Sequence, residues 1–320
     1  MKYNPEEILE EFEDNKIDLL TATELLTSII ENSKRDEIRI NAINKLVKII
    51  PLGNKLFEIL ENLVVSDESA EIRHIAINYI GNFFLYKALP LLNWAIKNEA
   101  DYICQIEIVK LLGILNIKDS KLALFQEIQK FIKKKYINKD RKIENKKFRK
   151  VLKKYLKERS FEEFTHKELV KILINILIIS YLFTQFNNVY YELNPQNGLI
   201  IKLDLSDMEY EVKGTPWTWK NNIKSLSEIP SLNHLNSLHH LDLSNNQIDN
   251  LKELINLPNL THLILRNNRL SILKNLDYIN NLHHLEFIDL RGNEIVKYIK
   301  KNDFNPKIRV PLKDYYTKIK

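Results

Sequence analysis

A leucine pattern in the last third of the chain constrains the fold most strongly. Three segments follow the template Leu-x-x-Leu-x-Leu-x-x-Asn-x-Leu, with other aliphatic residues at some leucine positions: LHHLDLSNNQI (238–248), LTHLILRNNRL (260–270) and LEFIDLRGNEI (285–295). An earlier segment, IIKLDLSDMEY (200–210), has Met208 in place of the asparagine. Because successive side chains of a strand alternate between its two faces, the spacing predicts short parallel strands whose leucines fill a common core. Three asparagines stand where a side-chain amide can satisfy backbone groups at the turn after each strand: Asn246, Asn268 and Asn293.

A second repeat, with helical spacing, occupies the first third. Its segments are DEIRINAINKLVKI from Asp36, AEIRHIAINYIGNF from Ala70 and YICQIEIVKLLGIL from Tyr102. Arg39, Arg73 and Gln105 fall in register, and apolar residues recur at helical intervals. Further apolar helices are expected between these segments, at 54–65 and 87–97. Each helical hairpin cannot bury its apolar face alone, so the hairpins are predicted to stack.

Both patterns resemble known repeat families. The Glu-Ile-Arg sequence followed by Ala resembles HEAT repeats over residues 20–130, although Gln105 departs from the expected Arg. The leucine segments resemble leucine-rich repeats of the 22-residue class. The resemblance implies an α-solenoid of HEAT-like helical hairpins followed by an α/β leucine-rich repeat solenoid with parallel strands. It also implies a binding scaffold, because proteins built from these families usually have that role.

The expected organisation has three parts. Residues 1–130 form the HEAT-like domain, residues 131–187 a basic helical connector with an apolar capping helix, and residues 188–320 the leucine-rich repeat domain with its caps. Residues 211–222 lengthen the first leucine-rich unit and contain Trp217 and Trp219. This tryptophan pair is interpreted as a plug over an open core, with an exposed binding anchor as the alternative.

The connector carries most of the positive charge. Residues 130–159 contain 15 lysines and arginines against three acids, a formal charge of +12 in a chain of net charge +6. Apolar residues persist through this run, so it is predicted to be helical and partly packed. A candidate basic patch consists of Lys146, Lys147, Arg149, Lys150, Lys153 and Lys154. A solvated face or intramolecular docking on the acidic N-terminal segment is favoured, and nucleic acid and an acidic protein or lipid remain open.

The most apolar helix follows the connector. Thr165 and Glu168 form a capping-box pattern at its start. Lys171, Asn175 and Ser180 interrupt the apolar run that follows. A membrane span needs about 20 predominantly apolar residues, so a buried helix is favoured over a membrane anchor.

The leucine-rich strands also predict a binding surface. The positions between the inward residues form columns on the concave face, where neighbouring strands lie about 4.8 Å apart. The predicted partner-binding residues are Lys202, Asp204, His240, Asp242, His262, Arg266, Phe287, Asp289 and Arg291. Aromatic and Arg residues flanked by polar groups are typical of protein-binding hot spots, whereas a solvated face without a partner is the alternative.

The sequence gives little support for a catalytic, metal or cofactor site. Six scattered glycines exclude a GxGxxG loop or a P-loop, and the histidines of the repeat region are not expected to converge on a metal. The single cysteine, Cys104, excludes an internal disulfide, lies in a helical segment and is expected to be packed rather than nucleophilic. The acidic first residues lack an apolar stretch, so a cytoplasmic protein without a secretory signal is expected. No catalytic residue, metal or cofactor is predicted.

The sequence therefore favours a non-enzymatic intracellular adaptor that binds a partner protein of unknown identity on its concave face. The alternatives are a nucleic-acid-associated protein that uses residues 130–159, and a regulatory subunit of an enzyme such as a phosphatase. A membrane partner is not expected.

Overall fold

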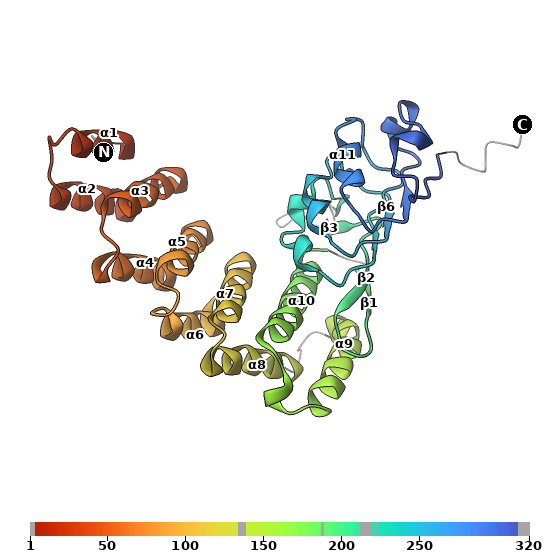
Figure 1. Cartoon of the computed structure of the whole chain (residues 1–320), viewed down its shortest axis with the longest axis horizontal. Helices are drawn as coiled ribbons and strands as arrows, with labels where there is room; N and C mark the ends of the chain where they lie inside the picture. Colours follow the sequence, from red (N-terminus) through yellow and green to blue (C-terminus); the bar gives the residue numbers. More distant parts are fainter. Residues whose placement is uncertain (1–3, 134–138, 187–188, 212–218, 222, 313–320) are drawn as a thin grey trace, which may run out of the picture. The chain divides into compact units, whose positions relative to one another are not determined.

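The computed structural model describes residues 4–133, 139–186, 189–211, 219–221 and 223–312. Within this part of the chain, packed helices are followed by a five-stranded, largely parallel sheet (Figure 1). The chain forms two compact units, residues 1–123 (unit 1) and residues 124–320 (unit 2). The division falls within α8 (Lys118–Lys133).

Unit 1 consists of helices that pack in pairs (Figure 1). After α1 (Pro5–Glu13), the pairs are α2 (Leu19–Asn32) with α3 (Asp36–Ile49), α4 (Asn54–Ser66) with α5 (Ala70–Phe83), and α6 (Leu89–Asn98) with α7 (Tyr102–Leu115). The second helices also contact one another in succession, α3 with α5 and α5 with α7. Ala42, Ala76 and Ile108, which align in the sequence, are fully buried on these helices. The predicted stack of helical hairpins is therefore present.

Polar side chains fix where these helices begin. At α1, Asn4 Oδ1 accepts the backbone N–H of Glu7 at 2.9 Å, and Glu7 Oε2 accepts the N–H of Asn4 at 3.1 Å. Asp18, Ser69 and Asp101 accept first-turn N–H groups at the starts of α2, α5 and α7. Each such cap stabilises a helix by about 1 kcal/mol.

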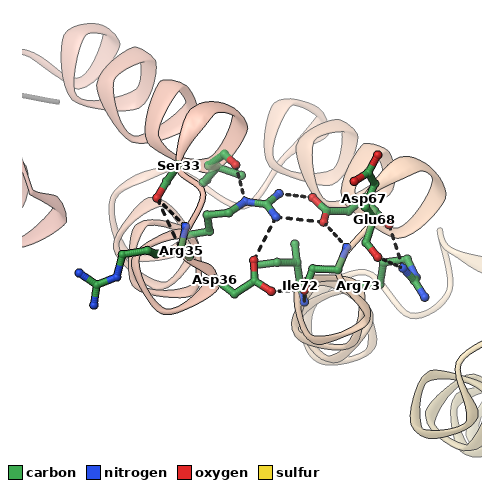
Figure 2. Close-up of polar contacts among 10 residues, drawn as sticks. Ser33, Arg35, Asp36, Asp67, Glu68, Ile72 and Arg73 are labelled. Atoms are coloured by element: carbon green, nitrogen blue, oxygen red, sulfur yellow. Dashed lines mark hydrogen bonds and ion pairs between the residues drawn. The ribbon is translucent and has the colours of Figure 1, made fainter. Parts of the chain in front are cut away.

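An arginine on α3 connects the first two hairpins. Arg39 forms an ion pair with Asp67, the residue that ends α4, and both side chains are largely buried. Its Nε donates to the Ile30 carbonyl at 2.7 Å. Asp36 contributes a further ion pair to Arg39 at 3.4 Å and accepts the Ser69 hydroxyl at 2.6 Å. Figure 2 shows Asp36, on α3, and Asp67, just after α4, converging on this network.

The next two hairpins repeat this arrangement. Arg73 on α5 donates through Nε and Nη2 to the two carboxylate oxygens of Glu99, both at 2.8 Å. Gln105 takes the corresponding place on α7 and donates to the Glu99 carbonyl at 2.6 Å. Arg39 and Arg73 therefore each pair with the carboxylate that follows the first helix of the next hairpin, whereas Gln105 binds a carbonyl just before its own helix.

Unit 2 begins with helices that enclose aromatic side chains. These helices are α9 (Lys139–Lys157), a 3-10 turn η1 (Phe161–Glu163) and α10 (His166–Gln185). Phe148 on α9 is fully buried, with its ring centroid 5.7 Å from that of Phe131 and 6.0 Å from that of Tyr191. Leu152, one turn later, is also fully buried. The described part of the basic segment is thus helical and partly packed, as predicted.

The capping box predicted for α10 is confirmed. Thr165 N–H donates to Glu168 Oε2 at 2.8 Å, and Glu168 N–H donates to Thr165 Oγ1 at 3.2 Å. By length and composition α10 is able to cross a membrane, but 56% of its apolar stretch is buried within the fold, as in the core helix of a globular protein. Asn175 is 3% exposed, and its Oδ1 accepts the N–H of Ile200 at 2.8 Å. This amide interrupts the apolar run because it binds the start of a strand.

The sheet of unit 2 follows the leucine template. Its order is β1 (Tyr190–Leu193), β2 (Ile200–Asp204), β5 (His240–Asp242), β6 (His262–Ile264) and β7 (Phe287–Asp289). β1 is antiparallel to β2, and the remaining neighbours are parallel. Leu203, Leu241, Leu263 and Ile288 are in register and fully buried. The strands and their inward-facing residues are therefore those that the spacing predicts.

Short helical segments return the chain from each strand to the next. They are η2 (Leu226–Glu228), η3 (Leu232–His234), η4 (Lys252–Asn256), α11 (Asn275–Asn280), η5 (Glu294–Lys297) and η6 (Lys301–Asp303). Leu232, Leu254 and Ile279 are buried on them and close the core opposite the sheet. The lengthened first unit contains a hairpin of β3 (Glu209–Glu211) and β4 (Trp219–Asn221). Trp217 and the side chain of Trp219 lie outside the described residues, so the predicted plug stays a prediction.

The predicted asparagine positions form a buried row beside the sheet. Asn268 Oδ1 accepts the Ile248 N–H at 2.9 Å, and its Nδ2 donates to the Leu243 and Leu265 carbonyls at 2.8 and 3.0 Å. Asn246 and Asn293 make equivalent bonds one coil before and one coil after. Each amide therefore ties together the backbones of neighbouring coils.

Candidate functional site: the open sheet face

The face of the sheet opposite the leucine core carries two rows of side chains. In the first row, Lys202, His240, His262 and Phe287 are neighbours in the strand register. In the second row, Asp204, Asp242, Ile264 and Asp289 are neighbours. We call these eight residues the open sheet face. The columns predicted from the sequence are thus in register. The interval between repeat units places equivalent template positions side by side on adjacent strands.

An aromatic stack forms the centre of the first row. The rings of His240 and His262 are stacked, with centroids 5.7 Å apart and planes 20° apart. The Phe287 ring follows, 5.8 Å from that of His262. All three side chains are half-buried, so ring surface remains accessible on the face. The stack therefore offers a continuous aromatic strip across three strands.

Cations stand at both ends of the aromatic stack. Lys202 lies beyond His240 and pairs with Glu192 of β1 at 3.4 Å. Beyond Phe287, the Arg309 guanidinium lies over the ring, 5.2 Å from its centroid. The Arg309 backbone also forms an isolated parallel bridge with Phe287. An aromatic centre with a charged rim is the layout of a protein-binding patch.

The pKa of His240 lies below its ordinary value. Burial lowers the pKa of His240, and the positive charge of Lys202 and the neighbouring His262 act in the same direction. Asp242 and Asp204 oppose the pKa shift but are outweighed. These surroundings favour a neutral His240 imidazole in the stack.

In the second row, two aspartates hold the turns that follow their strands. Asp204 Oδ1 accepts the N–H of Ser206 at 3.0 Å and its hydroxyl at 2.7 Å. Asp242 Oδ1 makes the same bonds to Ser244, at 2.9 and 2.6 Å. Each aspartate uses one oxygen for the turn, and both side chains remain half-exposed on the face.

Asp289 differs from the other aspartates because it is buried. It is 4% exposed and receives hydrogen bonds from Arg291 Nε at 2.9 and 3.1 Å. Burial raises the pKa of Asp289, but the bonds from Arg291 outweigh it, so that the pKa is lowered overall. Asp289 and Arg291 therefore bind each other, and their predicted contact with a partner stays a prediction. Arg266 is half-buried near the same end of the second row.

The predicted basic patch is largely exposed on α9, with one exception. Lys146, Lys147, Lys150, Lys153 and Lys154 are exposed. Arg149 instead turns toward the protein, where its guanidinium lies 5.2 Å from the centroid of the Phe131 ring. Arg149 therefore differs from the lysines, because it is half-buried at the edge of the packed side of the helix, and its place in a binding patch stays a prediction.

The remaining candidates for chemistry are metal ligands and the single cysteine. Within them, no group of three or more His, Cys, Asp or Glu side chains is placed to hold a metal ion. Cys104 is fully buried on α7, where its thiol donates to the Ala70 carbonyl at 3.3 Å. Burial raises the pKa of this thiol far above its usual range, so Cys104 is a packing residue, as expected.

Sequence reasoning missed Arg309 and Lys157. Arg309 lies 22 residues after Phe287, with Val310 and Leu312 in place of Ile288 and Leu290. Residues 309–312 therefore match part of the leucine template. This partial match would have predicted Arg309 on the open sheet face. Lys157 is exposed at the end of α9 and has the helical spacing of the other lysines.

Comparison of the chain with protein-family models, curated proteins and solved structures found no match.

Proposed function

We propose that this protein is a non-enzymatic intracellular scaffold that binds a partner protein on the open sheet face. We assign the paired helices of unit 1 to HEAT-like repeats and the sheet of unit 2 to leucine-rich repeats. The first assignment is supported by Arg39 and Arg73, which repeat one set of bonds at the aligned position of successive hairpins. The second is supported by the asparagine row, whose amides repeat at the template position.

The observation that carries the binding proposal is the aromatic stack. His240, His262 and Phe287 form an accessible strip on strands whose positions are fixed by the buried leucine core. Rigid aromatic side chains lose little conformational entropy on binding and dominate hot spots of protein interfaces. The strip is bordered by the carboxylates of Asp204 and Asp242 and by Lys202 and Arg309, which are suited to the polar rim of an interface.

The experiment compares capture by two matched double variants. The face variant, His240→Ala with His262→Ala, removes both stacked imidazoles. The control variant, His283→Ala with His284→Ala, removes two exposed histidines that lie before β7 and outside the stack. Tagged full-length wild type and both variants are incubated with nuclease-treated lysate of the source cells, and captured proteins are quantified by mass spectrometry.

We expect that wild type and the control variant capture one protein stoichiometrically. The amount of that protein captured by the face variant is expected to be at least fivefold lower. The circular dichroism spectrum and melting temperature of the face variant must match those of wild type, so that loss of capture is not loss of fold. If every captured protein is retained equally by both variants, the open sheet face is not the binding site.

A further inference from the structure

The exposed side of α9 carries an unusual density of lysine. Residues 146–157 contain six lysines and one arginine and no acidic residue. The lysines are all exposed: Lys146, Lys147, Lys150, Lys153, Lys154 and Lys157. We call these six residues the lysine stripe. Phe148 and Leu152, on the other side of the helix, are fully buried.

The stripe is continuous along the helix. At about 100° per residue, the six lysines occupy an arc of about 120°, opposite Phe148 and Leu152. With a rise of about 1.5 Å per residue, the stripe is about 16 Å long and presents at least one ammonium in each turn. The direction in which the stripe faces is fixed, because the buried side chains of Phe148 and Leu152 hold α9 in one orientation about its own axis.

Among the residues that the structure describes, little negative charge neutralises the stripe. Among the described residues, the one ion pair that the stripe makes is Lys154 with Glu158 at 3.8 Å, and both side chains are highly exposed. Exposed pairs of this kind contribute little energy, so the positive charge remains available to a ligand. The ligand class that such a row of ammonium groups fits is a polyanion with regularly spaced charges.

We propose that the lysine stripe binds the phosphate backbone of double-stranded DNA. Duplex DNA carries one charge per about 1.7 Å of its axis, so a 16 Å stripe faces several phosphates at once. Its major groove, about 12 Å wide, also admits the exposed half of a helix, whereas the major groove of duplex RNA is too narrow.

Two other polyanionic surfaces fit α9 less well. Stable membrane binding needs a second, apolar signal beside the charges, and the apolar residues Phe148 and Leu152 are buried inside the protein. Binding of single strands relies on exposed aromatic rings that stack on bases. The aromatic residue beside the stripe, Tyr155, is half-buried and packs edge-on against Phe164 at 5.6 Å. The stripe therefore offers charge without stacking surface, which matches a duplex backbone.

The test is fluorescence anisotropy with a labelled 20-bp DNA duplex of arbitrary sequence and the full-length protein, at several salt concentrations. Six phosphate contacts predict that log K falls by about 5 per decade of salt. Lys150→Gln with Lys153→Gln and Lys157→Gln removes three contacts and is expected to reduce that slope to about 3 and to weaken binding at least tenfold near 0.1 M salt. These side chains are exposed, so the variant is expected to fold normally.

A charge-matched control separates the stripe from overall charge. Lys252→Gln with Lys274→Gln and Lys297→Gln removes three exposed lysines elsewhere in unit 2 and is expected to retain wild-type affinity. Equal loss in both triple variants would overturn the proposal, because binding would then follow net charge. Tighter binding to a 20-bp RNA duplex, to single-stranded DNA or to vesicles containing 30% phosphatidylserine would also overturn it in favour of that ligand.

Discussion

Single buried amides hold the coils of unit 2 together. Asn246, Asn268 and Asn293 are 4, 7 and 5% exposed, and each satisfies backbone groups that no strand partner reaches. Asn175 on α10 provides the corresponding acceptor for the N–H of Ile200 at the first parallel strand. These residues are costly to replace, since an unsatisfied buried donor or acceptor costs about 1–3 kcal/mol.

Replacing Asn268 by Ala is therefore expected to lower the free energy of unfolding by about 2–4 kcal/mol. The change leaves the N–H of Ile248 and the carbonyls of Leu243 and Leu265 without their amide partner. Urea denaturation followed by circular dichroism measures the loss. The exposed Asn302→Ala serves as the control and is expected to change the unfolding free energy by less than about 0.5 kcal/mol. Equal values for the two variants would contradict the structural role of Asn268.

Glu168 makes the stability of unit 2 depend on pH. Burial opposes ionisation of this carboxyl, but hydrogen bonds from Arg159 and Thr165 outweigh it and lower the pKa of Glu168 to about 2. A carboxyl whose pKa is lower in the folded state stabilises the fold above its ordinary value of 4.5, and the stabilisation is lost as the pH falls from there toward 2.

Glu168→Gln is accordingly expected to destabilise the protein by about 1–2 kcal/mol at pH 7, after allowance for solvent screening of the partly exposed side chain. The difference between wild type and variant should shrink at pH 3.5, where part of the carboxyl's contribution is already lost. Urea unfolding at both pH values measures it. A difference that is independent of pH would show that charge at Glu168 is not what stabilises the capping box.

At the scale of elements, the stack of unit 1 depends on ion pairs at the loops between helices. Glu99, which ends α6, has a side chain only 5% exposed and is held by Arg73 of α5. Since a buried carboxylate without its cation is strongly unfavourable, the pair fixes how the second hairpin meets the third.

Arg73→Met is expected to cost about 3 kcal/mol of unfolding free energy, because it leaves the charge of Glu99 buried and unpaired. The double variant Arg73→Met with Glu99→Met removes both charges and should recover most of that loss. Thermal and urea unfolding of wild type, the single variant and the double variant measure these differences. A double variant as unstable as the single one would mean that packing of the arginine, rather than charge compensation, is what stabilises the contact.

The sequence predicted elements well where a pattern repeats. The leucine interval determined the strands and their register, and the aligned Arg39, Arg73 and Gln105 marked the second helices of the pairs. It says less about how a single side chain divides between solvent and a nearby partner. Asp289 and Arg291 share the template positions of accessible residues but bind each other, and Arg149 packs on Phe131. Such choices depend on contacts across the fold, which a single template position does not encode.

At the scale of the whole molecule, unit 2 presents two chemically distinct surfaces. The open sheet face offers stacked aromatic rings within a charged rim, whereas the lysine stripe offers ammonium groups alone. A protein partner and a polyanion therefore do not compete for the same residues. Variants of one surface are expected to leave binding at the other unchanged.

The most direct measurement is the dissociation constant of the purified partner for wild type, the face variant (His240→Ala with His262→Ala) and the control variant (His283→Ala with His284→Ala). Isothermal titration calorimetry at pH 7.5 and 0.15 M salt provides it. We predict that the face variant binds at least tenfold more weakly, since hot-spot side chains together contribute more than about 1.4 kcal/mol. The dissociation constant of the control variant is expected to be unchanged. Three equal dissociation constants would contradict the assignment of the open sheet face as the binding surface.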